Sequence, residues 1–139
     1  MRFSSQVRAG LRAALALGLR EGAGPVSVRE MAADVGVSEH YLEQVMAQLR
    51  RAGVVQATRG ASGGYELARA ATDLRLVDVL RALDGLPEGG DPAAEADPME
   101  RVLAAHLARA SAAMAAAAEV RLADLVQAVR EAGSLMYYI

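Results

Sequence analysis

Two short segments around one arginine and three glycines carry the clearest chemistry in this sequence. Residues 54–67 predict two strands joined by a turn of the form Arg-Gly-x-x-Gly-Gly. Glycine tolerates positive φ, so Gly60, Gly63 and Gly64 allow a tight turn that holds the guanidinium of Arg59 on a narrow projection. Such a projection fits the minor groove of DNA, where the negative potential attracts arginine. Taken alone, the segment is equally consistent with an ordinary hairpin that carries a solvated arginine.

A helix-turn-helix pattern precedes this hairpin. A helix that begins at Ser27 ends at Gly36, and a second helix follows over residues 38–52. Ser38 caps this second helix and, with the backbone amides of its first turn, offers hydrogen bonds to phosphate. Base edges would meet the exposed side chains of the first two turns, and phosphates would meet two arginines at the far end: His40, Glu43, Gln44, Arg50 and Arg51. The alternative is a three-helix bundle with a solvated polar face, which the hairpin directly after it disfavours.

The other elements predicted in the N-terminal part, up to about residue 83, are helices. Ser4 and Ser5 offer an N-cap to a helix that runs to about Arg20. Its apolar face is predicted to contain Val7, Leu11, Ala14, Leu15 and Gly18. Ser27 and Glu30 form a capping-box pattern. A further helix is expected over about 76–83.

The back part begins with a linker at 85–97, rich in Gly, Pro and acids. Asp97 and Pro98 then start a helix that reaches about residue 119, about 33 Å long. One side of it is predicted to be apolar: Met99, Val102, Leu103, His106, Leu107, Ala110 and Met114. A short helix at about 122–130 and an apolar tail at 135–139 end the chain. So much uncovered apolar surface predicts a homodimer.

These elements predict a mainly α fold with a small two-stranded β-wing. A winged helix-turn-helix DNA-binding domain at 1–84 and the linker at 85–97 precede a helical dimerisation or sensor region at 98–139. Residues 1–70 contain nine Arg and six acids, whereas residues 71–139 contain six Arg and eleven acids. A basic N-terminal part and an acidic C-terminal part fit a DNA-binding module joined to a region that does not contact DNA.

Composition excludes several classes of function. The 139 residues include no Cys, which excludes disulfides, thiolate zinc sites and thiol redox sensing. With two His and no paired carboxylates beside a nucleophile, no catalytic site is expected. No long apolar run or signal-peptide pattern occurs, so we expect a cytoplasmic protein that does not contact the membrane.

Taken together, the motifs resemble the Rrf-two family of winged-helix repressors, which includes the iron–sulfur cluster regulator and the nitric-oxide-sensing repressor. The resemblance covers nearly the whole chain and lies in Ser-Glu-His-Tyr-Leu-Glu-Gln from Ser38, in the Arg-Gly-x-x-Gly-Gly-Tyr turn, and in segments 1–4, 27–31, 76–85 and 122–125. It implies a homodimer on a palindromic operator in double-stranded DNA. It also implies that Glu43 reads a base, that Ser38 and Tyr41 hold the DNA backbone, and that Arg59 enters the minor groove. Three more residues of the wing are predicted to contact DNA: Gly60, Ser62 and Gly63.

The chain departs from this family where a cofactor would bind. Cluster-binding members carry three cysteines between the fourth helix and the long helix, whereas this chain has none, and Arg8 and Arg12 stand where some members place a fourth ligand. Arginine cannot ligate a cationic cluster, so we expect no iron–sulfur cluster, no other cofactor and no metal. The alternatives for His106 are a backbone-bonded interface histidine and a metal or ligand contact.

Two further questions stay open from the sequence. The Ala-rich stretch 104–118 fits close helix packing or a cavity for a small-molecule effector. The rival to a DNA-binding regulator is a winged-helix adaptor that binds proteins and has lost DNA binding. An adaptor has no reason to keep Ser38, Glu43, Arg59 and the wing glycines together.

Overall fold

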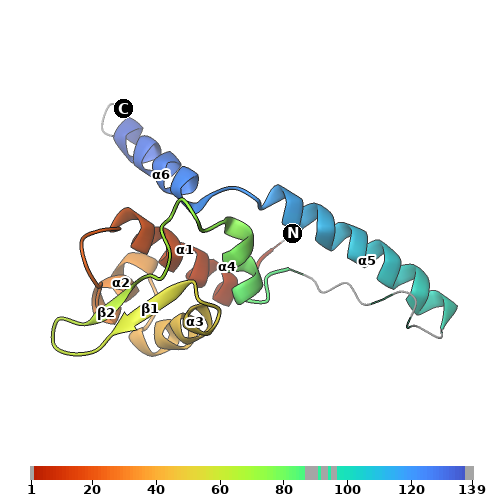
Figure 1. Ribbon diagram of the computed structural model, residues 1–139, viewed down its shortest axis with the longest axis horizontal. Helices are drawn as coiled ribbons and strands as arrows, with labels where there is room; N and C mark the ends of the chain where they lie inside the picture. The colour runs from red at the N-terminus through yellow and green to blue at the C-terminus, as the bar shows by residue number, and fades with distance from the viewer. Residues whose placement is uncertain (1, 87–90, 92–93, 95–96, 137–139) are drawn as a thin grey trace.

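The computed structural model describes residues 2–86, 91, 94 and 97–136. Its elements are α1 (Ser5–Leu19), α2 (Val28–Val35), α3 (Glu39–Arg51), β1 (Val55–Thr58), β2 (Gly64–Leu67), α4 (Leu76–Ala82), α5 (Pro98–Ala117) and α6 (Leu122–Met136). The first four helices and the antiparallel β1–β2 hairpin form one body, from which α5 projects (Figure 1). The predicted fold class, mainly helical with a two-stranded wing, is confirmed.

Helix α1 is central to this body and contacts α2, α3, α4, α6 and β2. Small residues make these close contacts possible. A β-carbon on Gly10 would lie 2.3 Å from Leu83 Cδ1, and one on Gly18 would lie 2.6 Å from Val126 Cγ2. The buried face of α1 contains Val7, Ala9, Gly10, Ala13, Ala14, Leu17 and Gly18.

The predicted apolar face of α1 was therefore wrong in part. Leu11 and Leu15 are only half-buried, while Leu17 is fully buried. Helical periodicity selects the largest apolar side chains, whereas the neighbouring helices pack most closely where α1 has glycine and alanine.

The connection between α5 and α6 is fixed to the body by backbone hydrogen bonds. Leu76 N–H donates to Val120 O at 2.9 Å, and Leu122 N–H donates to Leu74 O at 2.8 Å. Arg75 also forms an ion pair with Glu119. Leu122 and Val126 are buried in the main core, so α6 returns onto α1 while α5 does not.

The predicted C-terminal helix was too short, because α6 continues from about residue 130 to Met136 through good helix formers such as Glu131 and Ala132. Residues 137–139 of the predicted apolar tail, and most of the predicted linker at 85–97, lie outside the described residues. Among the helices that the structure describes, none is both long and apolar enough to cross a membrane.

Candidate nucleic-acid interface

The helix-turn-helix is built by two consecutive capping devices. Gly36 ends α2 in the left-handed conformation with φ 80°, and its N–H donates to Ala32 O at 2.8 Å. Two residues later, Ser38 Oγ accepts a hydrogen bond from the N–H of Tyr41 at 3.2 Å. Because the cap uses only a lone pair of the hydroxyl, the Ser38 O–H proton stays available as a donor.

Helix α3 separates its buried and exposed sides clearly. The buried side consists of Leu42, Val45, Met46 and Leu49. The predicted DNA-contact residues of α3 and its cap are all exposed except Tyr41. The exposed ones are Ser38, His40, Glu43, Gln44, Arg50 and Arg51. Helix α3 therefore presents to solvent the side chains predicted to read bases and both arginines of its last turn.

Two of the predicted contact residues already have partners within the chain. Tyr41 is half-buried, and its hydroxyl lies 3.5 Å from Ser5 Oγ on α1. Gln44 Nε2 lies 3.4 Å from Nε2 of His40, one turn earlier. Tyr41 is therefore directed toward α1 as much as outward, and Gln44 would have to leave His40 to pair with a base.

The wing is a hairpin in which Val55 pairs with Leu67 and Thr58 pairs with Gly64. Its tip, residues 59–63, turns through Gly60 at φ 113° and a hydrogen bond from Gly63 N–H to Gly60 O of 3.0 Å. Arg59 and Ser62 are exposed, and Arg59 has no hydrogen bond or ion pair within the described part of the chain.

The glycine roles in the wing differ from the prediction at one position. Gly60 and Gly64 have positive φ, but Gly63 does not. Gly63 is required for space instead, because a β-carbon there would lie 2.2 Å from the carbonyl oxygen of Thr58.

A contact that the sequence reasoning missed anchors the wing. Val26, in the connection between α1 and α2, exchanges two backbone hydrogen bonds of 2.8 Å with Tyr65 of β2. This bridge joins the wing to the residue that precedes the Ser27 cap of α2. A β-branched residue between Pro25 and a helix cap is a signal for an extended segment that could have indicated the bridge.

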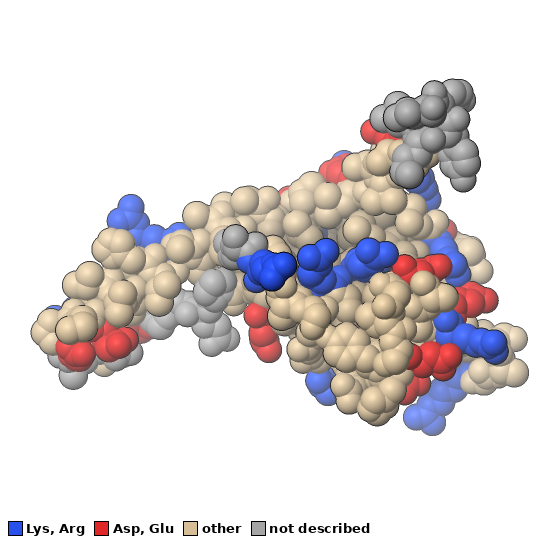
Figure 2. Space-filling model, turned by 180° about the vertical axis from the view of Figure 1, so that it is seen from behind, with Lys and Arg blue, Asp and Glu red and all other residues tan. Residues whose placement is uncertain are grey.

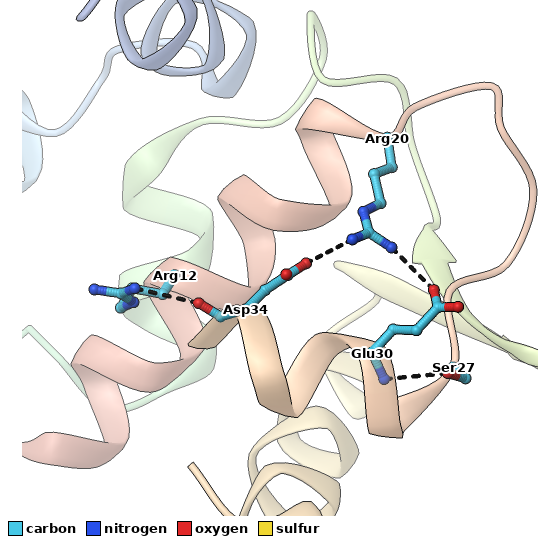
Figure 3. A network of polar contacts seen from close by, with 5 residues as sticks. All are labelled: Arg12, Arg20, Ser27, Glu30 and Asp34. Carbon is cyan, nitrogen blue, oxygen red and sulfur yellow. Dashed lines mark hydrogen bonds and ion pairs between the residues drawn. The ribbon is translucent and has the colours of Figure 1, made fainter. Parts of the chain in front are cut away.

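Helix α2 is also held on α1 by a polar network (Figure 3). Arg20 donates to Glu30 at 3.0 Å and to Asp34 at 2.8 Å, while Arg12 donates to the carbonyl oxygen of Asp34 at 3.2 Å. Exposed ion pairs of this kind contribute about 0–1 kcal/mol each. They therefore orient α2, and its buried residues provide most of the packing energy.

The predicted capping box at the start of α2 is only half formed. Ser27 Oγ accepts from the N–H of Glu30 at 3.2 Å, but the Glu30 carboxylate binds Arg20 rather than returning to the cap. The ion pair with Arg20 replaces the local hydrogen bond from the Ser27 backbone N–H that the sequence spacing suggested.

The side chains present do not fit an iron–sulfur cluster. The whole sequence contains no cysteine, and the described residues bring together no group of three His, Asp or Glu that could hold a metal ion. His106 is exposed, and its Nδ1 lies 3.0 Å from the carbonyl oxygen of Val102, one turn earlier. That ring nitrogen contacts the backbone, as expected for a backbone-bonded histidine rather than a metal or ligand contact.

Proteins with similar sequences are transcriptional regulators of the helix-turn-helix type. The model of the Rrf2 family, described as an iron-dependent transcriptional regulator, matches residues 3–128. The HTH-type transcriptional regulator CymR of Bacillus subtilis (strain 168) is 36% identical over 103 residues, which cover 74% of this chain and 75% of that protein. The HTH-type transcriptional regulator IscR of Escherichia coli O1:K1 / APEC is 37% identical over 84 residues, 60% of this chain and 52% of that relative.

Solved structures of such regulators have the same fold as this chain. CymR, the global cysteine regulator of B. subtilis, superposes with a TM-score of 0.72 at 33% identity, covering 91% of this chain and 97% of that one. IscR of T. potens gives a TM-score of 0.75 at 32% identity, covering 95% and 90%. The matched region contains the helix-turn-helix, the wing and the long helix, and the chain belongs to the Rrf2 family of transcriptional regulators, the family that its motifs resemble.

Proposed function

We propose that this chain forms a homodimer that binds a palindromic operator in double-stranded DNA and represses transcription. The observation that carries the proposal is the joint presentation of two exposed elements. The Ser38-capped helix α3 leads directly into the Arg59 wing, and the Val26–Tyr65 bridge fixes the wing to the entry of α2. One body therefore presents a helix of major-groove size beside a narrow basic projection.

The first two turns of α3 are assigned to base reading. The Glu43 carboxylate can accept from the N4 amino group of cytosine, and the Gln44 amide can pair with N6 and N7 of adenine. His40 lies one turn before Gln44 on the same exposed side. These side chains give specificity, because each base presents a distinct donor and acceptor pattern in the major groove.

Phosphate contacts are assigned to the two ends of α3. The free proton of the Ser38 hydroxyl and the amides of the first turn meet one phosphate, and Arg50 with Arg51 in the last turn meet another. In the wing, Arg59 enters the minor groove, and the exposed residues Gly60 and Ser62 with the half-buried Gly63 let the backbone approach the groove walls closely.

Dimerisation is supported by the surface of α5. None of its residues is buried, and Met99, Val102, Leu103 and Leu107 are between 49% and 72% exposed. Monomeric proteins seldom leave so continuous an apolar stripe bare. A two-fold dimer carries two recognition helices related by symmetry, which is why the operator should be a palindrome. Repression is the mode that the family resemblance supports.

We further propose that this regulator works without an iron–sulfur cluster, although the family is described as iron-dependent. Cluster iron is held by cysteine thiolates in nearly all such sites, and this sequence supplies none. The signal that controls this chain therefore differs in chemistry from a cluster.

Selection of binding sites from random DNA, followed by an electrophoretic shift assay, tests the proposal. The expected result is an enriched palindrome that the protein binds as a dimer, and a reporter with this operator that loses expression when the protein is present. Repeating the selection with small metabolites tests for an effector. No enrichment and no shift at moderate salt would favour the protein-binding adaptor instead.

A further inference from the structure

Within the recognition helix α3, His40 and Gln44 form a hydrogen-bonded pair on the exposed side. The two residues are one helical turn apart, where side chains meet, and Gln44 Nε2 lies 3.4 Å from His40 Nε2. An amide nitrogen donates and does not accept, so His40 Nε2 is the acceptor of this bond. The ring is therefore neutral, with its proton on Nδ1, and the amide oxygen of Gln44 is turned away from it.

The free end of the Gln44 amide decides which base it can contact. Pairing with both N6 and N7 of adenine would require Gln44 to leave His40, whereas a single contact through Oε1 would not. Oε1 is an acceptor, and it matches a base that presents an amino group in the major groove, which is adenine N6 or cytosine N4. The carbonyl oxygens of guanine and thymine offer it no hydrogen bond.

Protonation of His40 would invert this arrangement. A charged imidazole carries a proton on both ring nitrogens and accepts no hydrogen bond. The Gln44 amide must then turn, so that Oε1 accepts from His40 Nε2 in a charge-assisted bond that is stronger than the neutral one. The amide nitrogen becomes the free end, and it can donate to guanine O6 or thymine O4.

We propose that His40 is a positioning residue whose charge selects the base that Gln44 reads. Neutral His40 gives a preference for adenine or cytosine at one symmetric position per half-site, and charged His40 gives a preference for guanine or thymine there. Histidine is the side chain that changes charge between about pH 5 and 8, so the choice of operator depends on pH. The inference rests on the operator binding proposed above and specifies how one of its base contacts is set.

The other charged groups near α3 do not contact the His40 ring. On α3 itself the acidic neighbours Glu39 and Glu43 are exposed. The elements α1, α2, β1 and α4 pack against α3; β1 has no charged residue, and the others contribute Arg8 and Arg12, then Arg29, Glu30 and Asp34, then Asp78 and Arg81.

The distribution of charge over the surface leads to the same pair. Figure 2 shows a row of basic side chains across the body and acidic side chains at the free end of the projecting helix. Among the described residues, none of these charged groups forms an ion pair or hydrogen bond with His40, whose polar partner is Gln44. A change of charge on His40 therefore acts on the base contact through the Gln44 amide.

Selection of binding sites at two pH values tests the proposal. Between about pH 8 and about pH 5.5, the preference at one symmetric position per half-site should shift from adenine to guanine, or from cytosine to thymine, by about tenfold. His40→Gln should remove this shift, because an amide has the same hydrogen-bonding groups at both pH values. His106→Gln is the matched control and should keep the shift, since His106 is the only other histidine of the chain and lies on α5. Both histidines are exposed, so both variants should fold.

The tautomer of His40 gives a second readout that needs no DNA. In the variant His106→Gln, His40 is the one remaining histidine. Its ring nitrogen chemical shifts should place the proton on Nδ1 near about pH 8. Adding Gln44→Ala removes the donor to Nε2 and should lower the fraction of this tautomer. A ring with its proton on Nε2 in His106→Gln would overturn the proposal.

The outcomes of the site selection separate this inference from the proposed function. The same base preference at both pH values would overturn the inference, and so would a shift that persists in His40→Gln. A change of affinity with pH that is equal for all sequences would also overturn it, because His40 would then add charge without positioning Gln44. No enriched site at either pH would instead refute the operator binding itself.

Discussion

Gly64 of the wing packs directly against the carbonyl of Val26, where a β-carbon at position 64 would lie 2.1 Å from the oxygen. This approach is possible because Tyr65, the next residue, exchanges both of its backbone hydrogen bonds with Val26. The wing and the entry to α2 are therefore one unit, and backbone contacts hold the hairpin that carries Arg59 on the start of the helix-turn-helix.

Gly64→Ala should destabilise this unit strongly. The new methyl group collides with backbone atoms that cannot move without breaking the Val26–Tyr65 bridge, and φ of 154° at this position is unfavourable for alanine. We expect a loss of about 2–4 kcal/mol in urea unfolding, with weaker DNA binding. Gly60→Ala is the control, because its φ is 113° but nothing lies within 4 Å, so it should cost only about 1 kcal/mol. Equal losses would mean that strain, not contact, is the reason for Gly64.

Much of this architecture could be predicted from local signals. Ser38 and Gly36 are a cap and a stop whose chemistry is contained in a few residues, and α3 follows the prediction closely. Turn glycines likewise identified the wing. The exposed positions of α3 followed from helical periodicity once its apolar stripe was recognised.

Contacts between distant segments could not be predicted in the same way. The Val26–Tyr65 bridge joins residues far apart in sequence, and the Glu30 carboxylate takes Arg20 in preference to its own cap. The buried face of α1 was predicted only in part, because it also depends on where Leu83 and Val126 pack. In each case the local sequence allows several contacts, and the packing of distant segments decides which contact forms.

Ser38→Ala and Ser27→Ala form a matched pair that separates capping from DNA binding. Both hydroxyls accept a backbone N–H at 3.2 Å, so each loss should cost about 1 kcal/mol of folding stability. Only Ser38 lies at the end of the recognition helix, so Ser38→Ala should also weaken operator binding by about five- to tenfold. Ser27→Ala should leave operator binding within about twofold. Equal effects of the two variants on DNA affinity would remove the proposed phosphate contact of Ser38.

The protein should be colourless and insensitive to thiol oxidants. Purification without oxygen, or incubation with iron, sulfide and reductant, should give neither the visible absorption of an iron–sulfur cluster nor bound iron and sulfide in equal amounts. The reason is the lack of any cysteine thiolate to hold the irons. DNA affinity should be the same before and after treatment with an oxidant of thiols. A stable chromophore with stoichiometric iron and sulfide would contradict this.

Arg59→Ala should weaken binding to every DNA sequence. The Arg59 guanidinium is exposed and has no partner within the described residues. The substitution is therefore expected mainly to remove a positive charge from the minor groove. The slope of log affinity against log salt should fall by about one per wing, and any change in sequence preference should be confined to A·T-rich flanks, where this groove is narrow. Arg59→Lys should keep the salt slope. A change of preference at major-groove positions would mean that the wing is docked elsewhere.

Glu43→Ala should behave in the opposite way. A carboxylate near phosphates is repelled, so its removal should leave the affinity for random DNA equal or slightly higher. The specific operator should lose discrimination at one symmetric position per half-site, where the preference for cytosine relaxes by about 1–3 kcal/mol. Glu39→Ala is the matched control, because Glu39 is also an exposed acid in the first turn of α3 but has no assigned base. It should change the affinity for all sequences alike. Site selection with both variants measures the difference, and a uniform loss of affinity in Glu43→Ala with unchanged base preference would show that this residue does not face the base pairs.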